Sequence, residues 1–309
     1  MFIGCNTLSF TVNGESDEEA IKLLAKAGFN CIDLNLNRYS VRDPVNPFWN
    51  MTVVQQEKYA ASIKKTAREA QVYISQVHAP YPTYFPLKRK RKEVKEYIEN
   101  AIYIAALIGS PYVVVHPLVP PEAKTADEIK EAVEMSIDFY REFFSLLVQT
   151  GVKLAVENMF NWDRENDCPL PTVASTVECM RYIIDTLNHM VGEDAYVACL
   201  DTGHCMLSGG GDLPYMVQKL AHRLRLLHIH DNDGKRDKHQ APYKGIINWE
   251  EFAKSLVEIN YNGVLSLEVK TDSSDLDTAK RLFMSAETLR LTVEREKKNE
   301  LRSKKTKRA

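Results

Sequence analysis

Histidines gather in this chain where apolar, strand-like runs of residues end. His78 closes the run "VYISQVH", His116 closes "YVVVH" and His230 closes "LRLLHIH". His204 follows "VACLDTG", and His239 comes nine residues after His230. Imidazoles bind divalent metals and move protons near neutral pH. Because the carboxyl ends of the strands surround one pocket in a parallel barrel, these five side chains are expected to face a common site.

Carboxylates end three further strand-like runs: Glu157 in "KLAVE", Asp201 in "ACLD" and Glu268 in "VLSLE". A buried carboxylate without a partner is costly, and three of them close together repel one another unless a cation neutralises them. Three oxygens and one imidazole suit Mn²⁺, Zn²⁺, Mg²⁺ or Co²⁺. The sequence therefore predicts one divalent-metal site, made by Glu157, Asp201, His230 and Glu268.

Eight short apolar runs alternate with longer amphipathic segments. The runs are the elements that must position the histidines and carboxylates of the site. The runs are 2–8, 30–36, 72–78, 112–116, 152–157, 195–200, 225–230 and 264–269. Nearly continuous apolar runs indicate strands buried on both faces, as in a parallel sheet. Several helices are expected to begin at a capping residue followed three positions later by Glu; these residues are Ser16, Thr125, Ser175 and Asn248. The pattern predicts a single-domain (β/α)₈ TIM barrel over residues 1–295. A doubly wound open sheet is disfavoured by the eight units and by the lack of a G-x-G-x-x-G turn.

Composition sets the cellular context. A net charge of −2 gives no overall attraction to nucleic acid or to an anionic membrane. Six cysteines without a C-x-x-C pair, no recognisable signal peptide and no long apolar segment favour a cytoplasmic protein without a membrane partner. The basic segment 296–309 is expected to be a frayed tail. A second basic run, residues 88–92, fits either a solvated surface or a clamp for phosphate or DNA.

Several motifs occur in order at successive strand ends and resemble the xylose isomerase-like barrel superfamily. They are "HAPY", "VVVHPL", "AVENM", "LDTGH", "HIHDNDG" followed by "RDKHQ", and "GVLSLEV", and they span residues 72–270. This superfamily contains sugar and sugar-phosphate isomerases and epimerases, and abasic-site nucleases of the endonuclease IV type. The resemblance implies the barrel fold and a metal site. It leaves the substrate open, because one fold hosts many reactions.

The resemblance to ketose 3-epimerase-like members implies roles for particular residues. Glu157, Asp201, His230 and Glu268 would hold one metal, and Glu157 and Glu268 would also act as the acid/base pair. His204 and Arg236 match positions that contact substrate oxygens, and His78 is expected beside them. The implied activity is a divalent-metal-dependent sugar or sugar-phosphate isomerase or epimerase that acts through an enediolate. Its partner would be a small sugar, and a homo-oligomer is possible.

The endonuclease IV pattern implies an alternative, a phosphodiesterase with three zinc ions that acts on abasic DNA. In that pattern His116, Asp237 and His239 become additional metal ligands. All nine matching residues are present: His78, His116, Glu157, Asp201, His204, His230, Asp237, His239 and Glu268. The short loop between His230 and Asp237, the amino-terminal "MFIGCNTLSF" and the slightly negative charge favour the isomerase. A sugar-binding barrel without turnover is a third hypothesis, disfavoured because both glutamates are present.

One histidine lies outside both patterns. His228 comes two residues before His230, so the two side chains point to the same side of their strand. We expect His228 to belong to a second layer of the barrel interior.

Overall fold

The computed structural model describes residues 1–42, 46–207 and 211–306. One parallel sheet has eight strands in the order β10-β1-β2-β3-β4-β5-β8-β9. The strands are β1 Phe2–Asn6, β2 Cys31–Asn35, β3 Tyr73–His78, β4 Tyr112–Val115, β5 Lys153–Glu157, β8 Tyr196–Asp201, β9 Leu224–His228 and β10 Val264–Leu267. Each predicted run overlaps one of these strands to within one residue at the ends of β8 and β9, and the predicted (β/α)₈ barrel is confirmed.

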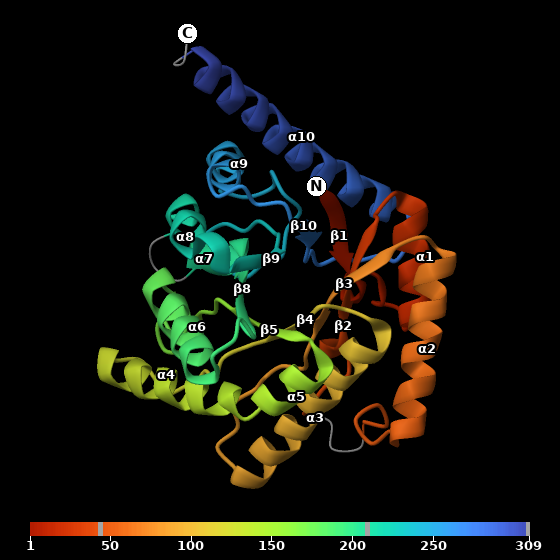
Figure 1. The fold of residues 1–309 in the computed structure, drawn as a ribbon, viewed down its shortest axis with the longest axis vertical. Coiled ribbons are helices and arrows are strands. Elements are labelled where there is room, and N and C mark those ends of the chain that lie inside the picture. The colour runs from red at the N-terminus through yellow and green to blue at the C-terminus, as the bar shows by residue number, and fades with distance from the viewer. Residues whose placement is uncertain (43–45, 208–210, 307–309) are drawn as a thin grey trace.

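Helices surround the strands (Figure 1). They are α1 Asp17–Ala27, α2 Val53–Glu69, α3 Lys88–Ile108, α4 Ala126–Arg141, α5 Phe144–Thr150, α6 Val177–Val191, α7 Thr202–Leu207, α8 Leu213–Leu220, α9 Trp249–Glu258 and α10 Leu276–Thr306. None of the described helices is long and apolar enough to cross a membrane.

Three of the four predicted helix caps are present. Ser16 and Thr125 form reciprocal capping boxes, and the Asn248 side chain accepts the amide of Glu251. The cap predicted at Ser175 is wrong, because its neighbour Thr176 caps α6 instead. The Ser175 hydroxyl is used one turn earlier, where it donates to the carbonyl of Thr172.

The barrel closes at the junction between β9 and β10, which we call the seam. The contacts across the seam differ between the two ends of the strands. In the described residues the seam has one bridge, Ile229 with Leu267, which lies toward the carboxyl ends of the strands. Toward the amino ends, the Tyr261 hydroxyl lies 3.2 Å from the carbonyl oxygens of both Arg225 and Val264. A side chain thus connects the two strands where ladder hydrogen bonds do not.

The interior of the barrel is apolar toward the amino ends of the strands. There a separate cluster of buried residues fills it: Val114, Ala155, Val197, Cys199 and Leu226. A much larger core lies between the strands and the surrounding helices. Packing against these two apolar regions fixes the positions of the strands. The polar residues at the carboxyl ends of the strands are fixed with them.

Two segments stand out from the alternation of barrel strands and helices. The connection after β5 contains an antiparallel hairpin of β6 Asn161–Asp163 and β7 Cys168–Leu170. Helix α10 continues beyond residue 295 to Thr306 and extends past the barrel (Figure 1), and the division expected at residue 295 stays a prediction. Residues 307–309 of the predicted tail lie outside the described residues, and its fraying stays a prediction.

Candidate metal centre

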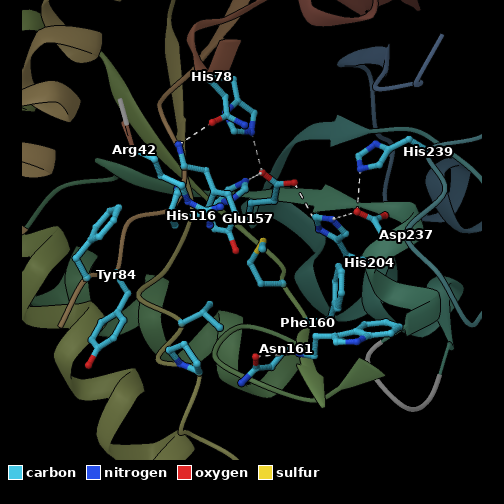
Figure 2. A pocket seen from close by; sticks show the side chains of 18 of the residues that line it. Arg42, His78, Tyr84, His116, Glu157, Phe160, Asn161, His204, Asp237 and His239 are labelled. Atoms are coloured by element: carbon cyan, nitrogen blue, oxygen red, sulfur yellow. Dashed lines mark hydrogen bonds and ion pairs between the residues drawn. The ribbon is translucent and has the colours of Figure 1, made fainter. Parts of the chain in front are cut away.

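A cavity of about 600 Å³ opens at the carboxyl ends of the strands. Seven of the nine residues in the motif set line it: His78, His116, Glu157, His204, Asp237, His239 and Glu268. Figure 2 shows Glu157 near the middle, with His78 and His116 on one side and His204, Asp237 and His239 on the other. The other two, Asp201 and His230, are fully buried and do not reach the cavity wall.

The outer wall of the cavity is largely aromatic, with Tyr81, Tyr84, Phe85, Phe160 and Trp162 among its lining residues. Two arginines, Arg42 and Arg164, also line it, and neither was singled out from the sequence. A polar floor beneath an apolar wall with a few cations is typical of sites for small polar ligands.

Two side chains hold the strand ends in place where the sheet ladder stops. Asn158 donates to the carbonyl of Asp201 at 2.9 Å and accepts the Asp201 amide at 2.6 Å. Thr202 Oγ1 donates to the carbonyl of His230 at 2.7 Å and accepts its amide at 3.0 Å. These reciprocal pairs fix the backbone that carries Asp201 and His230. Sequence reasoning missed both Asn158 and Thr202, although both lie inside the quoted motifs.

Close backbone approach is needed around His230. A β-carbon added to Gly203 would lie 1.9 Å from His230 Cε1. Only glycine therefore leaves room for this imidazole beside the start of α7. This steric requirement explains the glycine of the "LDTGH" motif.

Backbone carbonyls fix the tautomer of three histidines. The Nδ1 atoms of His78, His204 and His239 lie 2.7, 2.9 and 2.9 Å from the carbonyl oxygens of Ala79, Asn158 and Glu268. A carbonyl only accepts, so each Nδ1 carries the hydrogen and each neutral ring leaves its Nε2 lone pair free. This is the arrangement usual for metal-binding histidines.

Three imidazole nitrogens lie within hydrogen-bonding distance of carboxylate oxygens. His116 Nε2 lies 2.8 Å from Glu157 Oε2, and neither atom has a hydrogen-bond partner. His230 Nε2 lies 2.9 Å from Asp201 Oδ1, and His239 Nε2 lies 3.0 Å from Asp237 Oδ2. Lone pairs at these distances repel unless a proton or a cation lies between them. The residues therefore fit a divalent cation.

Protonation equilibria in the metal-free chain point the same way. Burial opposes the charge of His239, but Asp237 outweighs it and raises the pKa of His239 to about 9. Burial also opposes the ionisation of Glu157, yet His228 and His116 hold the pKa of that carboxyl well below its usual range. Burial lowers the pKa of His116. Glu157 and Asp237, whose pKa values the neighbouring histidines lower, stay ionised, and the positive charge must come from a proton or a metal.

Three overlapping groups have ligand atoms within 4.8 Å of one another, and the predicted quartet is divided among them. Glu157 and Asp201 gather with His204; Glu157 and Glu268 gather with His78 and His228; His230 gathers with His204, Asp237 and His239. The structure thus brings all nine motif residues into one region. The assignment of Glu157, Asp201, His230 and Glu268 to a single ion stays a prediction.

Arg236, expected to contact substrate, is not among the described residues that line the cavity, and its contact with substrate stays a prediction. Its guanidinium pairs with both carboxylate oxygens of Asp167 and lies 4.6 Å from the centre of the Trp162 ring. It therefore ties the β6–β7 hairpin to the loop after β9. The basic run 88–92 forms the start of α3, and none of its residues is among the described residues that line the cavity.

Fold and site together define a (β/α)₈ barrel with an imidazole and carboxylate centre at the carboxyl ends of its strands. The chain belongs to the xylose isomerase-like TIM barrel family, whose family model matches residues 21–291. It is 30% identical over 198 residues to an uncharacterized protein of Methanocaldococcus jannaschii, covering 63% of this chain and 64% of the relative. It is 29% identical over 189 residues to an uncharacterized protein of Sinorhizobium fredii, covering 59% and 55%. The chain thus spans less than two thirds of the length of these curated relatives.

Solved structures share the fold. A D-tagatose 3-epimerase-like protein has a TM-score of 0.72 at 22% identity, covering 96% of this chain and 99% of the other. An IOLI protein with a binding zinc atom has a TM-score of 0.72 at 19% identity, with the same coverages. A D-psicose 3-epimerase, solved in the presence of D-fructose, has a TM-score of 0.67 at 16% identity, covering 94% and 98%.

Proposed function

We propose that this protein is a divalent-metal-dependent isomerase or epimerase of sugars or sugar phosphates. One observation carries the proposal: Glu157 and Glu268 both line the cavity, among histidines whose Nδ1 atoms contact backbone carbonyls and whose Nε2 atoms face carboxylates. Sugar 3-epimerases among the proteins of the same fold support the choice of substrate class. Whether the enzyme inverts a carbon or moves the carbonyl depends on which faces of the substrate the two carboxylates reach.

The carboxylate oxygens and imidazole nitrogens of the site suit Mn²⁺, Zn²⁺, Mg²⁺ or Co²⁺. Glu157, Asp201, His230 and Glu268 would hold the ion, with His116, Asp237 and His239 available as further ligands. A bound divalent cation supplies Lewis-acid polarisation of the substrate carbonyl, which makes the neighbouring C–H more acidic. The zinc atom in the IOLI protein supports a metal in this fold.

The protein's own residues then move the proton. One of Glu157 and Glu268 removes the proton next to the carbonyl, which gives an enediolate, and the other carboxyl group returns a proton. Return to the opposite face of the same carbon inverts that centre, whereas return to the neighbouring carbon moves the carbonyl. His78 and His204 orient substrate hydroxyls, and the aromatic wall excludes water from the enediolate.

Deuterium exchange tests the proposal. Protein loaded in turn with each of the four metals is incubated in D₂O with a panel of ketoses, aldoses and their phosphates, and the sugars are analysed by NMR. We expect deuterium at one carbon next to the carbonyl, and its loss in Glu157→Gln and in Glu268→Gln. Failure of every sugar in the panel to exchange with any of the metals contradicts the proposal.

A second candidate, the three-zinc phosphodiesterase, is favoured by the convergence of the nine motif residues in one region, eight of them in the three ligand groups and His116 beside Glu157. Metal content separates the two functions. One ion per chain, measured by mass spectrometry after zinc loading, supports the isomerase. Two or three ions, together with cleavage of a duplex that contains an abasic site, support the phosphodiesterase.

A further inference from the structure

His228 is a buried imidazole that neither proposed function uses. It ends β9, and its side chain is fully buried. Its Nδ1 atom lies 3.0 Å from Glu157 Oε1 and 2.8 Å from Glu268 Oε2. A single nitrogen atom therefore contacts both carboxylates of the proposed acid/base pair.

The opposite edge of the ring faces two side chains. The Gln76 amide nitrogen lies 2.7 Å from His228 Nε2, and Asp33 Oδ2 lies 3.5 Å from the same atom. Carboxylate oxygens only accept, so the Nδ1 atom that contacts both glutamates carries a hydrogen. The shorter contact with Gln76 on β3 holds the ring so that this donor edge stays turned toward Glu157 and Glu268.

Packing alone does not call for a histidine at this position. Leu226 lies two residues earlier and points to the same side of β9, where it belongs to the apolar cluster of the barrel interior. A leucine or phenylalanine at position 228 would extend that cluster without burying ring nitrogens that need partners. The imidazole is used for its polar contacts, and those contacts lead to the two glutamates.

The contacts determine which carboxylate oxygens remain available. His228 occupies Glu157 Oε1, whereas Glu157 Oε2 has no hydrogen-bond partner and lies 2.8 Å from His116 Nε2. We propose that His228 is a positioning residue whose Nδ1 holds Glu157 and Glu268 in the relative orientation that a bound cation and the substrate require. Its catalytic consequence rests on the proposed function, but its effect on cation binding does not.

A matched pair of variants tests this role. In His228→Asn the amide nitrogen lies where Nδ1 was, and in His228→Gln it lies where Nε2 was. We expect Co²⁺ affinity, followed by the absorption of the bound ion, to fall about 10- to 100-fold in His228→Gln and to stay within about threefold of wild type in His228→Asn, as for other residues that orient metal ligands. The kcat for deuterium exchange should follow the same order, with KM changed less.

Thermal unfolding of both metal-free variants is the control for packing. Equal Co²⁺ affinities in the two variants, whether both resemble wild type or both are weakened alike, overturn the proposal. If either variant does not fold, Gln76→Leu replaces it, since this change keeps His228 but removes the donor to Nε2. A loss of about threefold to tenfold in Co²⁺ affinity is then expected, and unchanged affinity overturns the proposal.

The Co²⁺ measurement needs no sugar, so the two proposals fail separately. If wild type exchanges no deuterium with any sugar while the Asn and Gln variants still differ in Co²⁺ affinity, the proposed function fails and the role of His228 stands. If wild type exchanges deuterium but the two variants bind Co²⁺ alike, the role of His228 fails and the function stands.

Discussion

Toward the amino ends of the strands, Val114, Val197 and Leu226 fill the barrel interior with apolar side chains. Toward the carboxyl ends, the same strands or the residues just after them carry His116, Asp201 and His230. Both ring nitrogens of each histidine and the Oδ2 atom of Asp201 are buried without a hydrogen-bond partner. Apolar burial stabilises the fold, whereas unpaired polar burial costs free energy. The comparison teaches that the apolar end stabilises the barrel. This stability offsets the free-energy cost of burying nitrogen and oxygen atoms without hydrogen-bond partners at the other end.

The largest expected effect comes from the carboxyl end. Glu157→Gln should lower the rate of deuterium exchange by about 10²- to 10⁴-fold, because a proton-transfer group is lost. The metal-free variant should unfold at a lower temperature than wild type, because the contacts with His116 and His228 that keep the pKa of Glu157 low are lost with the charge. Exchange rates and thermal melts of the two proteins check both parts. A variant that retains exchange within tenfold of wild type breaks the comparison.

A different pattern is expected at the amino end. Leu226→Ala should destabilise the fold by about 2–5 kcal/mol, the range for leucine removed from a packed core. Exchange per folded molecule should remain near the wild-type rate at a temperature where the variant is fully folded. Urea unfolding followed by circular dichroism gives the first quantity. A stable variant with impaired exchange would mean that this cluster shapes the site directly.

Asp33 on β2 lies between the two ends and gives a pH-dependent test. Burial raises the pKa of Asp33 to about 6, from an ordinary value of 3.8. Between these two pH values the folded state keeps a proton that the unfolded chain has lost, so this group makes stability fall as pH rises from about 4 to about 6. Asp33→Asn removes the effect.

The Asp33→Asn variant should therefore gain stability over wild type as pH rises, by about 3 kcal/mol from pH 4 to pH 7, since each unit of pKa is worth about 1.4 kcal/mol. Urea unfolding at the two pH values measures the difference. A gap between variant and wild type that does not change with pH would show that Asp33 is solvated or paired in solution.

The smallest expected effect concerns the rim of the cavity. Arg236→Ala and Asp167→Ala should leave the unfolding midpoint unchanged, because this ion pair is exposed. Both should speed amide hydrogen exchange in the β6–β7 hairpin to a similar extent. If Arg236 contacts substrate, as the sequence predicts, Arg236→Ala raises KM and Asp167→Ala does not. If the two variants have equal KM values, the role of Arg236 is limited to its ion pair with the hairpin.

The sequence predicted the barrel because its signals are local. Short apolar runs and capping residues such as Ser16 and Thr125 depend only on neighbours in the chain. The position of the site followed from topology, since strand ends converge in any parallel barrel. Residues joined across long distances in the sequence were not predictable in this way: the pairing of Arg236 with Asp167, 69 residues away, depends on how two loops fold back.

The second layer of the site illustrates the same limit. Strand periodicity placed His228 on the same side as His230, and the structure agrees that it lies inside the barrel. Its contacts with Glu157, Glu268 and Gln76 come from three other strands or their ends, and no spacing in the sequence encodes them. Short hairpin strands such as Asn161–Asp163 carry too few residues for a recognisable alternation.

The seam gives metal depletion a consequence other than lost turnover. His230 follows β9 and Glu268 follows β10, so an ion held by both, as we propose, would span the seam, and its binding energy would also close the barrel. Without an ion, links between the two strands in the described residues are the Ile229–Leu267 bridge, the Tyr261 hydroxyl and the contact of His228 Nδ1 with Glu268 Oε2. Exposed strand edges pair readily with other chains. If the proposed ion binds there, the availability of divalent cations would also govern how easily this protein aggregates.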